Sequence, residues 1–408
     1  NTAIEVETLI IGAGPAGAVA AAMLRQRGRA VLVIEREQFP RFSIGESLLP
    51  QSMEYIEQAG LLRDVVEAGF QYKNGASFMW GDRQTAFDFR DKFSPGWGTT
   101  YQVQRANFDK VLADGAARLG ADVRYRHELI ELQPAHGASK ARIRDADGEV
   151  YEVNARFVLD ASGFGRTLPR LLGLERPSNF PARGAIFTHV EDRSPLGSFD
   201  RDKIRITVHP QHVDVWYWLI PFSNGRCSLG VVARREFLEQ YLGNETERLQ
   251  ALVGEDPSLR TLLKDALWDT PARQIVGYAS NVSQLCGPGY ALLGNAGEFL
   301  DPVFSSGVTI AVKSASLAVA AIDREIVGES VDWEADFARP LRAGVDCFRG
   351  FVEAWYAGSF QKIIYHEPQP VSVRRMICSI LAGYAWDLNN PYVAETKRRL
   401  GTLAAVCA

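Results

Sequence analysis

The apolar positions at the start of the chain predict a strand, a helix and a second strand in close succession. "VETLII" (residues 6–11) is a nearly continuous apolar run, which is typical of a strand buried on both faces. "AVAAAMLRQRG" (residues 18–28) reads as a helix that ends at a glycine, and "AVLVIE" (residues 30–35) reads as the next strand. This order predicts a βαβ unit and therefore a parallel sheet.

The same alternation returns later in the chain. "ARFVLDASGFG" (residues 155–165) and "GYALLG" (residues 289–294) each read as a strand followed by a glycine-rich turn, and a long helix is expected to start near Ser306. "HVDVWYWLIP" (residues 212–221) reads as a strand of a second sheet, with its two tryptophans on one face because side chains alternate. Residues 331–408 show apolar residues at helical spacing, which predicts a helical end segment.

The composition indicates a large globular chain and excludes several partners. The 408 residues are 46% apolar and 23% charged, which suits two or three structural units. A net charge of −4 gives no electrostatic reason to expect nucleic acid or an acidic membrane as a partner. The longest apolar run, residues 308–322, is too short and too polar to span a bilayer.

The cysteines and histidines predict neither a disulfide framework nor a metal site. Five cysteines occur without a CxxC pair, and six histidines occur without an HExxH spacing. The chain opens without the basic and apolar regions of a signal peptide. We therefore expect reduced thiols, no metal and a cytoplasmic location.

The turn between the first two strands carries a dinucleotide-binding pattern. Gly12, Gly14 and Gly17 have GxGxxG spacing, and Glu35 ends the following strand. The first glycine permits the tight turn, the second lets the backbone approach a pyrophosphate, and the third lets helix and strand pack closely. A carboxylate at position 35 can accept hydrogen bonds from a ribose diol. A merely tight βα turn would not explain that carboxylate.

Four further motifs follow this fingerprint. They are "RFSIGESLLP" (residues 41–50), "KNGASFMWG" (residues 73–81), "WYWLIP" (residues 216–221) and "FLDPVFSSG" (residues 299–307). Together, and in this order, they resemble the flavin-dependent halogenases, particularly those that act on phenol or pyrrole rings rather than on free tryptophan. The last two match the WxWxIP and FxxPxxSxG patterns of that family, and the resemblance covers the chain from residue 5 to about 325.

The resemblance implies an FAD site and a set of residues that contact FAD. One position departs from the family, since many relatives have Asp where this chain has Asn295; its amide can still form hydrogen bonds with the cofactor. Arg105 stands where such proteins carry a flavin-contacting arginine, although a surface arginine at a helix start is the alternative. The expected FAD-binding residues are Gly12, Gly14, Ala16, Gly17, Glu35, Arg36, Arg41, Ser47, Arg105, Asp160, Asn295, Pro302 and Gly307.

The resemblance also implies where a halide and a hypohalous acid are handled. Chloride or bromide would lie near Ser306 and Gly307, because a helix N-terminus offers free N–H groups to an anion. The alternative is that Gly307 only lets the helix approach the flavin. Lys73 would be the catalytic residue, holding the hypohalous acid by a hydrogen bond or reacting with it to form a haloamine.

Aromatic residues are expected on the substrate side. Phe78 and Trp80 follow the lysine, and Trp216 and Trp218 share a strand face that would cover the flavin. Their alternative is an ordinary aromatic core between packed elements, which the periodicity supports equally well. No acid that would take the ring proton can be assigned from the sequence.

The predicted fold class is α/β, with a GR2-type FAD-binding Rossmann-like domain, an antiparallel-sheet substrate domain and a helical C-terminal segment. That last segment would either close the substrate entrance or present a docking face, unless its aromatic residues are simply core. The FAD-binding domain is assigned to residues 1–60, 100–168 and 285–330, the substrate domain to 61–99 and 169–284, and the helical segment to 331–408.

The leading hypothesis is an FADH2-dependent halogenase. It would use dioxygen and chloride or bromide to modify a phenolic or pyrrolic substrate, either free or bound to a carrier protein. A separate flavin reductase would supply FADH2, because only one nucleotide fingerprint is present. The alternatives are a flavin-dependent aromatic monooxygenase or double-bond reductase, and a non-catalytic flavoprotein partner in a biosynthetic complex.

Overall fold

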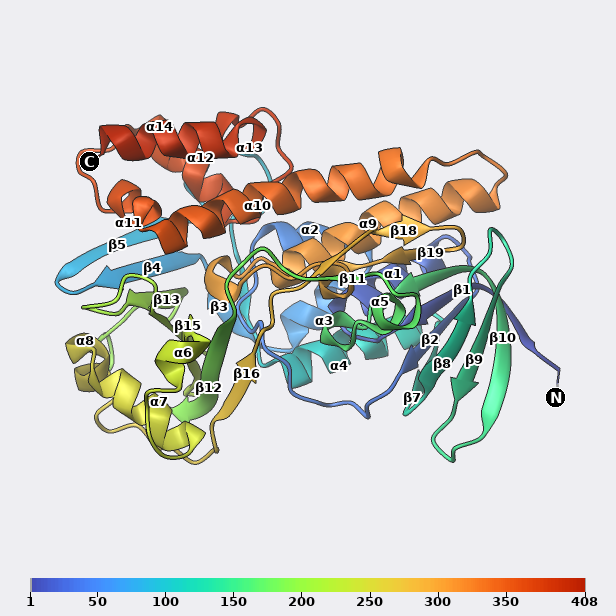
Figure 1. Ribbon diagram of the computed structural model, residues 1–408, viewed down its shortest axis with the longest axis horizontal. Helices are drawn as coiled ribbons and strands as arrows, with labels where there is room; N and C mark the ends of the chain where they lie inside the picture. Colours follow the sequence, from blue (N-terminus) through green and yellow to red (C-terminus); the bar gives the residue numbers. More distant parts are fainter. Residues whose placement is uncertain (1, 408) are drawn as a thin grey trace.

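Two large sheets lie at opposite ends of the molecule. The structure is a computed structural model that describes residues 2–407, so the outer limits of the assigned domains, residues 1 and 408, lie outside it. In Figure 1, β1, β2 and β10 stand at the right and β4, β5 and β13 at the left. The helices α9 and α10 run alongside one another across the top of that view. The mixed α/β architecture confirms the predicted fold class.

The first sheet is built around the predicted βαβ unit. β1 is parallel to both β2 and β10, and β10 is parallel to β19, so the apolar runs read from the sequence form buried central strands. The order is β18-β19-β10-β1-β2-β7, and β9 joins β10 to β8 as an antiparallel extension. The strands are β1 (Ile4–Ile11), β2 (Val31–Glu35), β7 (Asp122–Tyr125), β8 (Glu128–Gln133), β9 (Ser139–Arg144), β10 (Val150–Asp160), β18 (Cys286–Gly287) and β19 (Tyr290–Leu292).

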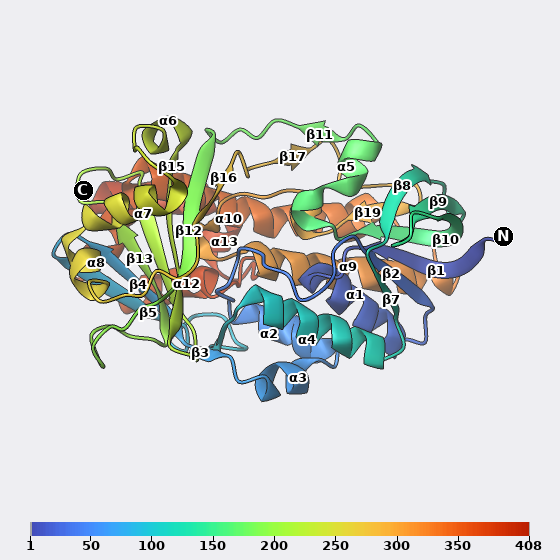
Figure 2. The same ribbon diagram turned by 90° about the horizontal axis from the view of Figure 1, so that it is seen from below.

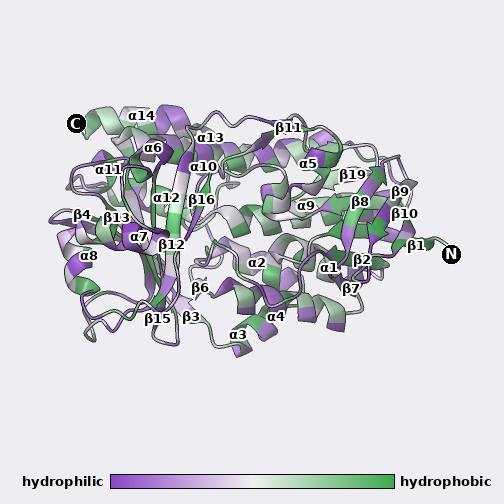
Figure 3. Cartoon of the chain, turned by 60° about the horizontal axis from the view of Figure 1, so that its bottom comes forward, coloured by the Kyte–Doolittle hydropathy of each residue, from purple (hydrophilic) through white to green (hydrophobic). Residues whose placement is uncertain are grey.

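Helices pack beside this sheet, and Figure 2 shows α1, α4 and α9 grouped near β1 and β2. The central α1 is alanine-rich and almost wholly buried, whereas α4 carries hydrophilic and hydrophobic residues along its length (Figure 3). The expected long helix begins at Gly307. The helices of this part are α1 (Pro15–Gln26), α2 (Gln51–Gln58), α3 (Leu62–Glu67), α4 (Arg105–Arg118), α5 (Thr167–Leu171) and α9 (Gly307–Ile326), with short 3-10 turns η1 (Gly163–Gly165), η2 (Gly294–Ala296) and η3 (Pro302–Phe304).

The second sheet has the order β16-β12-β15-β14-β13-β4-β5, and every pairing in it is antiparallel except that of β13 with β4. Its outer face packs against α6 (Arg235–Leu238), α7 (Glu245–Gly254) and α8 (Pro257–Leu262), and its inner face is turned toward the rest of the molecule. The strands are β4 (Gly75–Trp80), β5 (Arg83–Asp88), β12 (Arg183–Glu191), β13 (Lys203–Val208), β14 (Trp216–Pro221), β15 (Arg226–Arg234) and β16 (Arg273–Val276).

The alternation predicted for "WYWLIP" sorts its residues between the two faces. Trp216 and Trp218 belong to the inner core, whereas Tyr217 belongs to the outer core. Gly230 on the neighbouring β15 makes room for an indole, because a Cβ there would lie 2.3 Å from the Trp218 ring. A larger residue at position 230 would therefore displace a side chain of the inner face.

Short strand pairs and the C-terminal helices complete the fold. Two small pairs join β3 (Gln71–Lys73) to β6 (Thr100–Gln102) and β11 (Glu175–Arg176) to β17 (Asn281–Val282). The end of the chain is helical, as predicted: a π-helical turn η4 (Glu334–Ala338) precedes α10 (Arg339–Ala357), α11 (Ser359–Ile364), α12 (Val371–Leu381), α13 (Pro391–Ala394) and α14 (Thr396–Val406). Over residues 2–407, all five cysteines are unpaired and no helix is long and apolar enough to cross a membrane.

Candidate functional site

A cavity of about 640 Å³ lies between the two sheets. Its walls come from the glycine turn after β1, the loop that follows β2, the turn after β10, the inner face of the second sheet and the N-terminus of α9. Open parallel sheets bind ligands outside the carboxyl ends of their strands, and β1, β2 and β10 all end at this cavity. Among the expected site residues, those that line it are Gly14, Ala16, Glu35, Arg36, Arg41, Ser47, Arg105, Trp216, Trp218, Asn295, Pro302 and Gly307.

The glycine turn has the conformation that the fingerprint requires. Gly12 has φ +102°, and a Cβ on Gly17 would lie 1.9 Å from the Gly12 carbonyl oxygen. Gly14 lines the cavity directly before the first turn of α1. Glu35 is held at the cavity wall, since its two carboxylate oxygens accept hydrogen bonds from the backbone N–H groups of Ala13 (3.2 Å) and Glu37 (2.9 Å).

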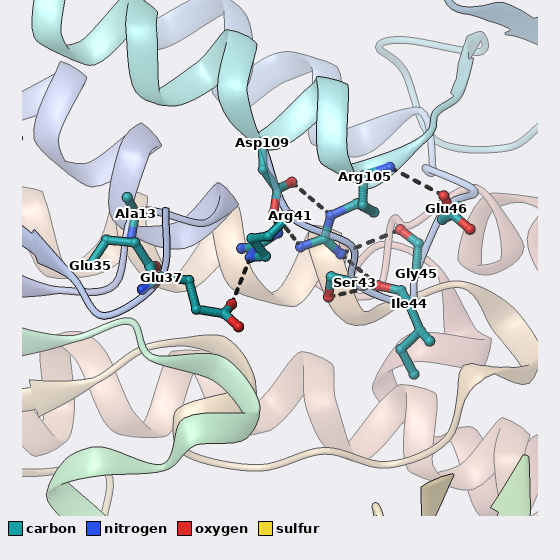
Figure 4. A network of polar contacts seen from close by, with 10 residues as sticks. All are labelled: Ala13, Glu35, Glu37, Arg41, Ser43, Ile44, Gly45, Glu46, Arg105 and Asp109. Carbon is teal, nitrogen blue, oxygen red and sulfur yellow. Dashed lines mark hydrogen bonds and ion pairs between the residues drawn. The ribbon is translucent and has the colours of Figure 1, made fainter. Parts of the chain in front are cut away.

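Two arginines of the cavity wall share one carboxylate (Figure 4). Arg105 donates from Nε to Asp109 Oδ1 (2.7 Å) and from Nη2 to Oδ2 (3.0 Å). Arg41 donates from Nη1 to the same Oδ2 at 2.5 Å, and Asp109 is buried. The carboxylate fixes both guanidinium groups, so they present a rigid positive edge to an anionic ligand. The sequence contained a signal for this pair, because Asp109 follows Arg105 by four residues on a helix.

A second polar contact joins the two halves of the site. Glu46 Oε1 lies 2.6 Å from His189 Nε2 on β12, and Glu46 Oε2 accepts from the Arg105 backbone N–H at 3.2 Å. Glu46 is buried and lines the cavity. The loop after β2 is therefore tied to the second sheet through a histidine that sequence reasoning left unassigned.

Asp160 does not line the cavity, unlike most of the other expected FAD-binding residues. It is fully buried and accepts hydrogen bonds from the backbone N–H groups of Ser162 (2.9 Å) and Leu168 (2.7 Å). Burial raises the pKa of this carboxyl group. Asp160 thus shapes the turn after β10, and within residues 2–407 the cavity wall there is made by Ser162 and its neighbours instead.

The expected halide loop lies at the opposite wall. Ser305 has φ 58°, and its turn leads directly into α9, whose first residue, Gly307, lines the cavity. Ser306 is buried as the N-cap residue and Asn295 lines the same wall. A 20-residue helix begins here, so its first N–H groups and the positive end of its dipole lie at the cavity wall.

Lys73 lies behind the cavity wall. It is 0% exposed, and its Nζ donates to Ser47 Oγ and to the Leu48 carbonyl oxygen, both at 2.7 Å. Ser47 lines the cavity, so it stands between the amine and the ligand space. The Phe89 ring lies 5.5 Å from Nζ, and no carboxylate within residues 2–407 forms an ion pair with it.

The environment of Lys73 favours a neutral amine. Burial lowers its pKa from 10.5 to about 7. A neutral amine has two N–H donors, and the two acceptors at 2.7 Å satisfy both of them. In the neutral form the lone pair makes no hydrogen bond, whereas the charge of the protonated form would be partly compensated by the face of the Phe89 ring.

The aromatic residues divide into two groups. Trp216 and Trp218 line the cavity, and Trp218 donates from Nε1 to Ser228 Oγ at 3.0 Å. Phe78 and Trp80 do not reach the cavity wall described by residues 2–407. They contact Trp355 of α10 and Tyr365 after α11, respectively, so they pack against the C-terminal helices.

The residues present fit an FAD molecule. The cavity runs from the glycine turn, where N–H groups and arginines can hold a pyrophosphate, to the α9 N-terminus, where a ring system can stack below the tryptophans. Glu35 provides acceptors for a ribose at the first end. The cavity wall thus supplies the donors and acceptors that a dinucleotide needs.

Known proteins are similar to this chain in sequence and in fold. The family described as "FAD binding domain" matches residues 5–280. A 1H-pyrrole-2-carbonyl-[peptidyl-carrier protein] brominase from Pseudoalteromonas luteoviolacea is 30% identical over 336 residues, which cover 81% of this chain and 80% of that protein. A crystal structure of a flavoprotein/dehydrogenase from Cytophaga hutchinsonii is 43% identical with a TM-score of 0.95, covering 99% of this chain and 98% of that one. The structure of the flavin-dependent brominase Bmp2 is 25% identical with a TM-score of 0.83, covering 99% of this chain and 100% of that one.

Proposed function

The chain belongs to the FAD binding domain family and, within it, to the flavin-dependent halogenases, and from this premise we propose that it halogenates an electron-rich aromatic ring through Lys73. The observation that carries the proposal is a buried amine with a lowered pKa, which is separated from the FAD cavity by the Ser47 side chain, in a cavity whose wall also includes the N-terminus of α9. An aromatic hydroxylase has no use for this pair of features.

Reduced FAD, when bound, supplies the two electrons with which dioxygen and a halide yield a hypohalous acid. The residues that would hold FAD are the glycine turn, Glu35, the arginine pair on Asp109 and the α9 N-terminus. Ser306 and Gly307 would hold chloride or bromide at the ring end of the cavity. Trp216 and Trp218 would keep a bulky substrate away from that end, which favours the small halide as the reacting partner.

Lys73 would then capture the hypohalous acid. Ser47 separates the amine from the cavity, because its hydroxyl accepts a hydrogen bond from Nζ and the residue lines the cavity. A free lone pair makes the amine a nucleophile toward the electrophilic halogen: the nitrogen–halogen bond forms as the halogen–oxygen bond of the hypohalous acid breaks, and the released hydroxide takes the proton that nitrogen loses and leaves as water. Retention of the halogen on the protein prevents its loss to solvent. We therefore propose haloamine formation rather than a purely hydrogen-bonded hypohalous acid.

The rate of halogenation is expected to rise with pH through about 7 and to level off above it. The reason is that the lowered pKa of Lys73 makes the neutral, nucleophilic amine the main form above that pH. Product formation from pH 6 to 9, corrected for the rate of reduced-flavin oxidation at each pH, measures this dependence. A rate that falls above pH 7 would instead indicate that the protonated amine is the active form and acts as a hydrogen-bond donor to the hypohalous acid.

The ring substrate is proposed to be a phenol or pyrrole, and the partners are a flavin reductase and, for a tethered substrate, a carrier protein. The relative from Pseudoalteromonas is named for a pyrrole held on a peptidyl carrier protein, which supports the pyrrole class. The reductase is proposed because residues 2–407 contain one dinucleotide cavity with one glycine fingerprint.

The test is a turnover assay with flavin reductase, FAD, NADH, dioxygen, chloride or bromide, and a panel of phenols and pyrroles, free and carrier-bound. Mass spectrometry is expected to find the isotope pattern of the halogen in the product. A hydroxylated product would instead show a monooxygenase. Oxidation of NADPH by the protein alone would favour the oxidoreductase alternative, which the similarity to a flavoprotein/dehydrogenase supports.

A further inference from the structure

A buried arginine beside the FAD cavity makes no hydrogen bond through its guanidinium group within residues 2–407. Arg183, on β12, is 5% exposed, and within residues 2–407 its side chain forms no ion pair and no hydrogen bond. Its guanidinium lies flat over the Tyr356 ring, with Cζ 3.4 Å from the ring centroid. Arginines are rarely buried unpaired, because removing the charge from water costs several kcal/mol without compensation.

The Asp301 carboxylate, which belongs to the same cluster, already accepts hydrogen bonds from other donors. Asp301 accepts hydrogen bonds from the hydroxyls of Tyr356 (2.7 Å) and Tyr278 (3.3 Å) at Oδ2, and from the Val303 N–H at Oδ1 (3.0 Å). Within residues 2–407 Asp301 forms no ion pair with Arg183, although the guanidinium charge acts to lower the pKa of this carboxyl group. Burial is the larger effect and raises the pKa of Asp301 to about 6, so the group is mainly ionised at pH 7 while its oxygens accept hydrogen bonds from the tyrosines and from Val303.

This cluster adjoins the cavity on the aromatic side. Tyr278 and Trp216 line the cavity, and Trp216 donates from Nε1 to the Tyr356 hydroxyl at 2.9 Å. Arg183 projects from the same face of β12 as Phe187, which also lines the cavity and stacks with Trp218 at a centroid distance of 6.2 Å. A flat ring between these aromatic side chains would bring a substituent toward the guanidinium.

We infer that Arg183 binds the carboxylate of the ring substrate, so that the cavity takes a free aromatic acid rather than a ring esterified to a carrier. The inference rests on the proposed function and names the substrate class for the same cavity. A guanidinium presents its N–H groups as a fork that matches a carboxylate, and stacking on Tyr356 fixes the plane of that fork.

FAD is the alternative source of an anionic oxygen, and the positions of the groups argue against it. The pyrophosphate is expected at the glycine turn, where Arg41 and Arg105 already form the positive edge. Arg183 is not part of the cavity wall that Arg41 and Arg105 form; it lies over Tyr356, whose hydroxyl accepts a hydrogen bond from the lining residue Trp216. The experiment therefore measures the affinity for FAD as well as the affinity for acids.

Binding to the FAD-loaded protein is measured by calorimetry with two acids, 4-hydroxybenzoate and pyrrole-2-carboxylate, and with their neutral amides. The acids are expected to bind at least about ten times more tightly than the amides, because a hydrogen-bonded charged pair contributes roughly 1.5–3 kcal/mol. Arg183→Gln is expected to remove this preference, and Arg183→Lys to restore only part of it, while the affinity for FAD stays unchanged.

The matched control is Arg205→Gln. Arg205 is also buried in the second sheet, on β13, but its Nη2 donates to Ser258 Oγ on the outer face. This variant is expected to keep the preference for acids. Three results would overturn the inference. The acids and the amides could bind equally well, or both acids could fail to bind at millimolar concentration. Arg183→Gln could also lose as much affinity for FAD as it loses for the acids. If the acids bind through Arg183 but no halogenated product forms, the inferred carboxylate site is supported and only the proposed function is contradicted.

Discussion

Lys73→Ala is expected to lower halogenated product by roughly 100- to 10,000-fold, the range in which positioned catalytic groups contribute. The amine is the one nitrogen nucleophile placed behind Ser47 at the cavity wall, so no neighbouring group within residues 2–407 can replace it. Oxidation of reduced FAD should continue at the wild-type rate, because the FAD-binding residues are untouched. Product is measured by mass spectrometry and reduced-flavin oxidation by stopped-flow absorbance.

The chain offers a matched control for this variant. Lys92 is a second buried lysine, and its Nζ donates to the carbonyl oxygens of Ser94 (2.6 Å) and Gly96 (3.0 Å) under the Tyr384 ring. It does not line the cavity, so Lys92→Ala is expected to retain halogenation. Lys73→Met, which keeps the length of the side chain, separates a lost amine from a packing defect. Full activity of Lys73→Met would contradict the proposed role.

Gly17→Ala is expected to lower the affinity for FAD by roughly 10- to 150-fold, since losing one hydrogen bond to a charged group costs about 1.5–3 kcal/mol. The added Cβ would lie 1.9 Å from the Gly12 carbonyl oxygen, and both atoms belong to backbone segments that cannot rotate away. Gly12 is also anchored, because its N–H donates to the Ile34 carbonyl oxygen at 2.8 Å. The start of α1 must therefore move, and its N–H groups would no longer point at the pyrophosphate.

The affinity is measured by titrating apoprotein with FAD and following flavin fluorescence. Gly401→Ala is the control, since Gly401 is also helical but has open space where a Cβ would be added. That variant is expected to keep its affinity for FAD and to gain about 0.5–1 kcal/mol in free energy of unfolding, because alanine favours a helix over glycine. Wild-type FAD affinity in Gly17→Ala would show that the turn is less tight than its geometry indicates.

Much of the site could be predicted where the chemistry depends on neighbours along the chain. Gly12, Gly17 and Glu35 lie within one βαβ unit, so spacing alone determined the turn and the carboxylate that faces the cavity. The alternation of "WYWLIP" placed both tryptophans on one face by the same local logic. The boundaries of the domains and the roles of the site residues stay predictions.

The sequence pattern around Asp160 did not predict where its side chain lies. Its position at the end of a central strand suggested a cofactor contact, but its two oxygens are used by backbone N–H groups of the following turn. Phe78 and Trp80 were expected beside the substrate because they follow Lys73. They face the C-terminal helices, whose position against β4 could not be inferred from a motif.

The sequence by itself determined the fold class, the dinucleotide turn and the presence of a lysine among aromatic residues, because these depend on periodicity and on spacing within single elements. Only the tertiary structure decided that Lys73 meets Ser47 and Leu48 and carries no paired charge. It also decided that Arg183 lies over the Tyr356 ring and makes no hydrogen bond through its guanidinium group within residues 2–407. The physical reason is that burial and hydrogen bonding depend on which distant segments pack together, and these set the protonation of an amine and the availability of a guanidinium.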